Sequence, residues 1–185
     1  LSDVRVNDLI ELTRKYADTP GAFPYLRVLA ADPAMNSTVR ERATIWIGVT
    51  KTPEAATFLL KHLAVLKETS ERLIADETSE TERSGIRMLL GATIIGLTRA
   101  GQESAGAEME KACKPDYWAE SKVFSAPDIT HLRRLAHEAL AASGSDAAVR
   151  YFANNSNRSE DIDTADSWLE KSARAKSQKQ SHEND

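Results

Sequence analysis

The chain has 185 residues, of which 41% are hydrophobic and 28% charged, and its formal net charge is −4 at pH 7. This length and balance are typical of one folded domain with a core of its own, without metal clusters or disulfides. The negative charge gives no overall attraction to nucleic acid or anionic membranes, and the single cysteine, Cys113, excludes an intrachain disulfide and a cysteine-based zinc site.

The sequence pattern contains no membrane-spanning segment. A spanning helix needs roughly 20 consecutive apolar residues, whereas the longest candidate, residues 88–98, is shorter and is framed by Arg87 and Arg99. Because the sequence starts at Leu1 without an initiating methionine, localisation stays open: we expect the cytoplasm, with an exported mature chain as the alternative. The same start is consistent with a fragment or cap of a larger protein.

The N-terminal part predicts three amphipathic helices, because apolar residues recur at spacings of three and four. The first covers residues 7–17. Thr19 followed by Pro20 has the pattern of a cap and a first helical residue, and it predicts a second helix antiparallel to the first. Thr38 and Glu41 have capping-box spacing and predict the start of the third helix.

Two longer helices are predicted in the middle of the chain. Thr52 and Pro53 repeat the cap-plus-proline pattern, and Ser79 with Glu82 repeats the capping box. The helix after Ser79 is apolar almost all round, so we expect it to be the central, most buried element. Gly101 is predicted to end it.

The last part of the folded region predicts shorter elements. A short helix is expected at residues 103–113 and a loop or single turn, held by its aromatic residues, at 116–127. Pro127 starts another helix, and Ser145 caps a final short one. We therefore assign residues 1–153 to one all-α domain.

Residues 154–185 form a polar C-terminal tail that we expect to be largely disordered, because few apolar side chains are available for burial. One apolar island surrounds Trp168. It could form a short helix that docks on the domain or on a neighbour, or it could stay exposed.

Two stretches of the chain share one pattern, which indicates an internal repeat. In both stretches a hydrophobic residue is followed by arginine, then by a small residue, a further apolar residue, a short turn and a second Ala-rich helix. A third stretch, from Glu82, fits more loosely. The aligned pairs are Val39 with Leu132, Arg40 with Arg133, Ala43 with Ala136, and Ile47 with Leu140.

This pattern resembles a HEAT repeat. The resemblance covers residues 36–152 and implies a short α-solenoid of antiparallel helix pairs, in which each pair covers the apolar face of the next. It also implies that the repeat arginines reach polar groups of the adjoining turn or repeat. A nonrepeating helical bundle is the alternative, because the stretch between Leu66 and Ser79 departs from a regular period.

The sequence offers no clear catalytic or metal-binding constellation. Among HEAT-like metalloenzymes, the deoxyhypusine hydroxylases bind two iron ions through several His-Glu pairs on successive helices. Here the repeat contains a single pair, His137-Glu138, and adjacent residues on a helix point about 100° apart. We therefore expect no catalytic residue, no metal and no cofactor.

The sequence favours a non-catalytic protein–protein interaction or scaffolding module that presents a concave solenoid surface to a protein or peptide. The alternative is a small helical enzyme or a DNA-binding HEAT-like protein, although acidic residues interrupt each arginine cluster and disfavour nucleic acid. The candidate contact residues lie on the second helices of two pairs: Phe58, His62, Arg150 and Tyr151.

Overall fold

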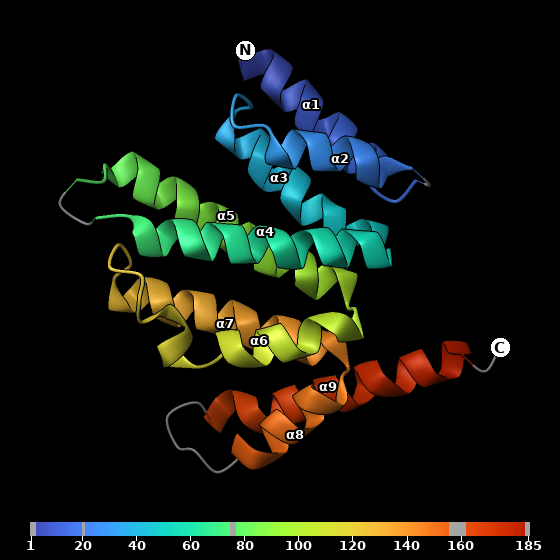
Figure 1. Cartoon of the computed structure of the whole chain (residues 1–185). Helices are drawn as coiled ribbons and strands as arrows, with labels where there is room; N and C mark the ends of the chain where they lie inside the picture. The colour runs from blue at the N-terminus through green and yellow to red at the C-terminus, as the bar shows by residue number, and fades with distance from the viewer. Residues whose placement is uncertain (1–2, 20, 75–76, 156–161, 184–185) are drawn as a thin grey trace.

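The chain is all-α, as predicted. The structure, a computed structural model, describes residues 3–19, 21–74, 77–155 and 162–183, and within these ranges it contains helices and no strand (Figure 1). The α-helices are α1 (Asp3–Tyr16), α2 (Ala22–Ala31), α3 (Ser37–Ile47), α4 (Pro53–Arg72), α5 (Glu80–Ala100), α6 (Gly106–Ala112), α7 (Ala126–Ser143), α8 (Asp146–Asn155) and α9 (Ile162–Glu183). Short 3₁₀ helices lie at η1 (Gly48–Thr50), η2 (Glu103–Ala105) and η3 (Pro115–Trp118).

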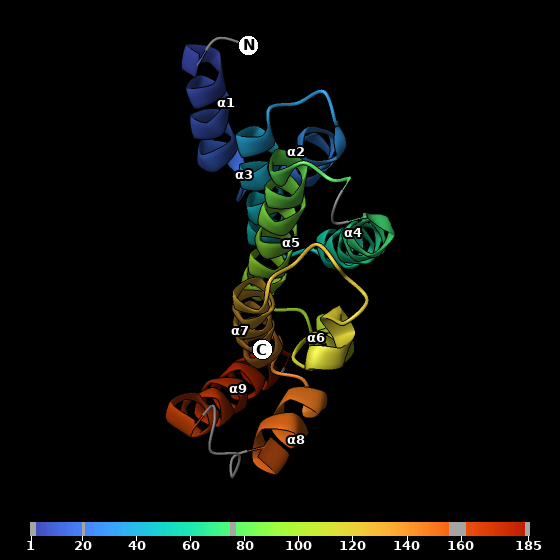
Figure 2. The ribbon, with the colours of Figure 1, turned by 90° about the vertical axis from the view of Figure 1, so that its left-hand side faces the viewer.

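The helices are arranged in two layers (Figure 2). The odd layer contains α1, α3, α5, α7 and α9, and each of these packs against the next odd helix. The even layer contains α2, α4, α6 and α8, and each of these packs against the odd helix that follows it. Both layers bow toward the even side in Figure 2, so the odd layer lies on the inner side of the bend.

Helix α5 is the central, most buried element, as predicted from its nearly uniform apolar surface. Ten of its 21 residues are buried, more than in any other helix of the described chain. It packs against α3 and α7 within the odd layer and against α4 in the even layer. Because α3, α4 and α7 cover α5 from three directions, its apolar side chains are removed from water on nearly every face of the helix.

Two glycines allow the backbones of α5 and the end of α3 to touch. A Cβ atom on Gly48 would lie 2.0 Å from the carbonyl oxygen of Gly96, and a Cβ atom on Gly96 would lie 2.9 Å from the carbonyl oxygen of Thr44. No side chain fits at either place without moving a backbone. The small residues therefore set how closely α3 and α5 approach.

Several predicted helix starts are confirmed by their caps. The Thr52 hydroxyl accepts a hydrogen bond from the Ala55 amide (3.2 Å), and the Ser79 hydroxyl accepts one from Glu82 (3.2 Å). Helix α7 starts with a capping box between Ser125 and Asp128. Helix α5 ends at Gly101, whose φ of 57° belongs to the left-handed region.

Two predicted caps are wrong. Helix α2 begins after Gly21, and Thr19 instead donates its hydroxyl proton to the Tyr16 carbonyl (2.6 Å), at the end of α1; Pro20 lies outside the described residues. Helix α3 is capped by Asn36, whose side chain accepts from the Thr38 amide (2.9 Å). Asn, Ser and Thr all favour this position, so nearby residues compete for it and local spacing alone does not choose between them.

The C-terminal tail differs from the sequence prediction. Where a largely disordered tail with a short helix was expected, α9 has 22 residues and packs against α7 and α8. Its approach is close, since a Cβ atom on Gly144 would lie 2.8 Å from the backbone nitrogen of Lys176. Docking on the preceding helices supplies apolar contact that the polar composition did not reveal.

The two aligned arginines make the same kind of contact. The Arg40 Nε–H donates to the carbonyl of Ala30 (3.3 Å), near the end of α2, and the Arg133 Nε–H donates to the carbonyl of Cys113 (2.8 Å), just after α6. In both cases an arginine of an odd helix forms a hydrogen bond with the C-terminal end of the preceding even helix. These carbonyls have no intrahelical partner, so the arginines satisfy groups that every helix end leaves open.

The close contact at Gly96 predicts opposite effects of alanine at two positions in α5. Gly96→Ala should destabilise the protein by roughly 1–3 kcal/mol, because its Cβ meets the Thr44 carbonyl. Gly85→Ala should instead stabilise it by about 0.5–1 kcal/mol, since nothing lies within 4 Å of that added Cβ and alanine favours the helix. Urea denaturation of both variants measures the difference; equal effects would contradict the close contact.

The arginine contacts predict a second pair of matched effects. Arg40→Ala and Arg133→Ala should each lower the free energy of unfolding by about 1–2 kcal/mol, because a helix-end carbonyl loses its donor. Arg42→Ala and Arg134→Ala are the controls on the same helices. Arg42 is exposed, and the mostly exposed Arg134 pairs with Glu138, so each substitution should lower the free energy of unfolding by less than about 0.5 kcal/mol. Chemical denaturation checks both pairs, and equal losses in all four variants would refute the assigned role.

Candidate functional site

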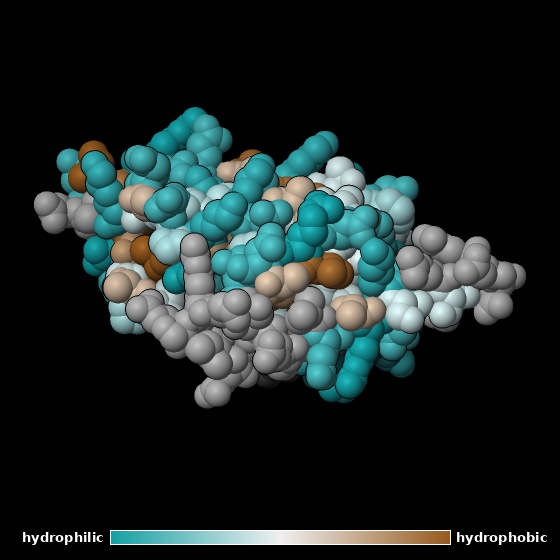
Figure 3. Space-filling view, turned by 90° about the horizontal axis from the view of Figure 1, so that it is seen from below, coloured by the Kyte–Doolittle hydropathy of each residue, from teal (hydrophilic) through white to brown (hydrophobic). Residues whose placement is uncertain are grey.

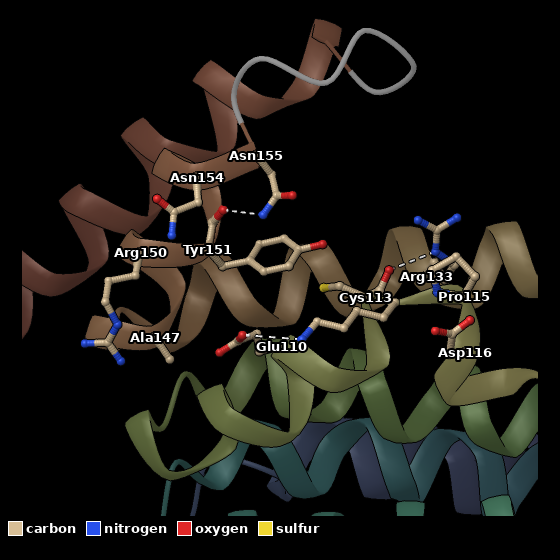
Figure 4. A pocket seen from close by; sticks show the side chains of 11 residues that line it. Glu110, Cys113, Pro115, Asp116, Arg133, Ala147, Arg150, Tyr151, Asn154 and Asn155 are labelled. Carbon is tan, nitrogen blue, oxygen red and sulfur yellow. Dashed lines mark hydrogen bonds and ion pairs between the residues drawn. The ribbon is translucent and has the colours of Figure 1, made fainter.

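A polar pocket of about 480 Å³ lies between α6, η3, α7 and α8 (Figure 4). Its walls come from three successive helices and the turn that joins two of them. Three basic and two acidic side chains line it, so its formal charge is +1, and a phenol and two amides add further hydrogen-bonding groups. These eight residues are Glu110, Lys114, Asp116, Arg133, Arg150, Tyr151, Asn154 and Asn155.

The close approach of α6 to the turn between α7 and α8 builds the pocket. A Cβ atom on Gly106 would lie 2.2 Å from the Ser145 hydroxyl oxygen, so only glycine allows this contact. Ser145 caps α8 by accepting from the Ala148 amide (3.1 Å). The start of α8 is therefore held against the start of α6, and the pocket opens toward the other ends of the two helices.

The three basic side chains of the pocket differ in their ion pairs and hydrogen bonds. Lys114 pairs with Glu110 at 3.7 Å. Arg133 uses Nε for the Cys113 carbonyl, which leaves its two terminal nitrogens without a hydrogen bond to the described residues. Arg150 is exposed, and the carboxylate one turn before it, Asp146, pairs with Lys176 of α9. The pocket therefore keeps two guanidinium groups available on opposite walls (Figure 4).

Tyr151 belongs to a partly buried chain of polar contacts. Its hydroxyl lies 3.3 Å from His137 Nε2. His137 Nδ1 lies 2.7 Å from the Arg133 carbonyl oxygen, which only accepts, so Nδ1 donates this hydrogen bond. Tyr151 is thus a half-buried, oriented wall of the pocket.

The Cys113 thiol is unsuited to nucleophilic chemistry. Burial raises its pKa far above the usual range, more than the nearby Arg133 lowers it. Since the thiolate is the reactive form, the side chain stays protonated and weakly reactive at neutral pH. Cys113 contributes to the pocket as a buried wall residue.

Phe58 and His62, the other two candidate contact residues, lie elsewhere. Phe58 of α4 meets Phe23 of α2 edge to face, with ring centroids 6.1 Å apart, and stacks on His62 at 5.6 Å. Both side chains are half-buried. The structure therefore brings Arg150 and Tyr151 together and separates them from Phe58 and His62.

His62 is held in the neutral form. Burial, and secondarily the positive charge of Arg40, lower its pKa from 6.5 to about 4. Its Nε2 atom is buried and has no hydrogen-bond partner among the described residues. A protonated imidazole would therefore be a poorly solvated charge beside an arginine.

Trp168, the residue proposed for tail docking, packs against the domain. Its ring stacks on Phe152 of α8 with centroids 6.4 Å apart, and the Lys171 ammonium group lies over the Trp168 ring, 4.2 Å from the ring centroid. Phe152 in turn meets the Tyr151 ring at 5.4 Å. The tail tryptophan therefore supports the helix that carries half of the pocket.

Sequence reasoning missed most of the pocket. Glu110, Lys114 and Asp116 surround the end of α6, for which the sequence predicts only a short helix followed by a loop or turn, and Asn154 and Asn155 fall in the predicted tail. Arg133 was recognised for its place in the repeat and not for its position beside Tyr151. The one available signal was the cluster of charges around Pro115, directly after a short helix.

The described residues form neither a metal-binding cluster nor a membrane-spanning helix. In these ranges no group of three or more His, Cys, Asp or Glu side chains is placed to hold a metal ion. His137 and Glu138 face different partners, Tyr151 and Arg134. None of the described helices combines the length and apolar character that a membrane crossing requires.

Comparison of the sequence with protein-family models and with curated proteins, and of the structure with solved structures, found no match.

The depressed pKa of His62 predicts how stability depends on pH. Between pH 6.5 and about 4 the unfolded state binds a proton that the folded state does not, so the free energy of unfolding should fall as pH falls through this window, by about 3 kcal/mol at most. His62→Leu should remove this part of the decline. Urea denaturation at several pH values measures it.

The matched control for this pH dependence is His131→Gln, which alters an exposed histidine of α7 and should retain the wild-type slope. If His62→Leu loses stability with pH as steeply as the wild type, the assignment to His62 is wrong.

Proposed function

We propose that the chain is a HEAT-like α-solenoid that binds a protein or peptide partner without catalysing a reaction. The equivalent contacts of Arg40 and Arg133 support the repeat, because both residues occupy the aligned position and both satisfy the end of the preceding even helix. The aligned apolar residues Val39 and Leu132 are also both buried. Stacked helix pairs of this kind expose extended surfaces suited to binding.

The observation that carries the binding function is the polar pocket across α6, α7 and α8. A peptide that crosses it would meet Arg133 on one wall and Arg150 on the other. The fixed Nε contact of Arg133 orients its guanidinium group in advance, which lowers the entropy lost on binding. Two guanidinium groups that flank amide and phenol groups favour a segment with carboxylate side chains or a free C-terminal carboxylate.

The lining of the pocket differs from the surface that the family resemblance implies. The resemblance implies partner contacts on the concave side, whereas most residues of the pocket belong to α6, η3 and α8. The even helices α6 and α8 lie on the outer side of the bend (Figure 2). Of the four candidate residues, Arg150 and Tyr151 remain in the proposed contact. Phe58 and His62 are assigned instead to the packing of α2 on α4.

Selection from a displayed library of random peptides tests the binding function. We expect enriched peptides to contain Asp, Glu or a required C-terminal carboxylate. Arg150→Glu should weaken their binding by about 10- to 100-fold, since a charge-assisted hydrogen bond contributes roughly 1.5–3 kcal/mol. Fluorescence polarisation with labelled peptides gives the affinities.

The matched control is Arg72→Glu, the same charge change at an exposed arginine of α4, which should leave the affinity within about twofold of the wild type. Enrichment of basic peptides, or equal losses in both variants, would be incompatible with the proposed pocket.

A further inference from the structure

Helix α8 contributes residues both to the polar pocket and to the contact with α9. Arg150 and Tyr151 line the pocket. Asp146 and Phe152 instead contact α9. Helix α8 has ten residues, and helices of this length are marginal in water unless tertiary contacts stabilise them. The pocket wall that α8 forms therefore depends on the helices packed against it, which include α9.

Polar contacts hold the C-terminal half of α9 on the domain. Lys176 pairs with Asp146 at the start of α8, and the Lys179 ammonium group donates to the carbonyl of Ser143 at the end of α7. Both lysine side chains are partly exposed, so water and dissolved salt compete for these contacts. Exposed ion pairs contribute little to stability, and this half of α9 is therefore held weakly.

A buried hydroxyl group weakens the docking of α9 further. Ser172 lies in the middle of α9 with an exposed fraction of 0%, and its Oγ atom has no hydrogen-bond partner among the described residues. Water would satisfy this hydroxyl group if α9 were released, whereas the docked helix leaves it unpaired. Docking therefore carries an energetic cost that alanine at the same position would remove.

Helix α9 is compatible with water in a released state. Its exposed residues include Lys171, Arg174 and Ser177. The end of the molecule at which α8 and α9 lie is mostly hydrophilic, with small separate apolar patches (Figure 3). Release would uncover the stacked rings of Trp168 and Phe152, which is a limited apolar area. Elements held by few apolar contacts are those that open locally while the rest of a protein stays folded.

Release of α9 would change the polar pocket in two ways. The Asp146 carboxylate, no longer paired with Lys176, would lie one helical turn from Arg150 and partly neutralise it. Helix α8 would also lose the ring that stacks on Phe152, so its wall of the pocket would become less ordered. A smaller positive charge and a less ordered wall both disfavour the binding of an acidic segment.

We infer that α9 docks reversibly on α7 and α8 and that its docking orders the α8 wall of the polar pocket, so that the pocket binds an acidic segment more tightly while α9 is docked. The effect on binding rests on the proposed function of the pocket. Ser172 and Lys176 are the positions at which substitutions should shift the docking of α9, because one is buried in the contact and the other pairs across it.

Hydrogen exchange of the free full-length chain, followed by mass spectrometry, tests the docking without any ligand. Ser172→Ala should slow the exchange of α9 amides by about fivefold or more, because it removes a buried unpaired hydroxyl group. Ser172→Glu should speed the exchange of both α9 and α8 by about tenfold or more, because docking would bury a charge. Exchange of the α5 amides should stay unchanged, which shows that the variants fold.

The affinity for an acidic peptide tests the consequence for the pocket. The probe is the labelled peptide most enriched on the wild-type chain in the library selection, measured by fluorescence polarisation. Ser172→Glu should weaken its binding by about fivefold or more, since the α8 wall is no longer ordered in advance. Ser172→Ala should bind it at least as tightly as the wild type.

Lys176→Glu is a second variant at a partly exposed position, and it places a like charge opposite Asp146. It should speed the exchange of α9 and α8 and weaken peptide binding in the same way as Ser172→Glu. The matched control is Arg174→Glu, the same charge change at an exposed residue of α9 that pairs within the helix with Glu170. It should leave exchange and affinity within about twofold of the wild type.

Two results would overturn the inference. One is exchange of α9 that neither Ser172→Glu nor Lys176→Glu accelerates. The other is faster exchange of α9 while the exchange of α8 and the peptide affinity stay as in the wild type. If no acidic peptide binds the wild-type chain, the proposed function fails, whereas parallel changes in the exchange of α8 and α9 would still support the dependence of the pocket wall on α9.

Discussion

The burial of α5 is the constraint on which the rest of the arrangement depends. A helix that is apolar almost all round is stable only when neighbours cover it from several directions, and α3, α4 and α7 do so. The closest of these contacts requires the glycines at positions 48 and 96, where backbone meets backbone. With α3 and α7 fixed on opposite sides of α5, the even helices take the spaces beside them, and two layers result.

The polar character of the pocket follows from this layering. The polar pocket opens between helices of neighbouring pairs, where Arg133 already serves a structural carbonyl and charged side chains can reach water.

Helix α9, in the C-terminal segment, contacts the helices α7 and α8 that line the polar pocket. Gly144 lets the α9 backbone approach the end of α7, and Trp168 stacks on Phe152, the neighbour of Tyr151. Lys176 of α9 pairs with Asp146, and this pairing lowers the pKa of the Asp146 carboxyl. Because that carboxylate is engaged by lysine, it neutralises the nearby Arg150 less. A segment interpreted from its composition as a tail therefore influences the charge that the pocket presents.

The sequence by itself determined the features that depend on near neighbours: the all-α class, the starts at Thr52 and Ser79, the burial of α5, and the alignment of Arg40 with Arg133. Caps and apolar stripes are interactions over three or four residues, so spacing reveals them. Only the tertiary structure decided that α2 covers Phe58, that α9 docks, and that Arg133 and Arg150 face one pocket. These features depend on distances between residues far apart in the chain, and local periodicity carries no information about them.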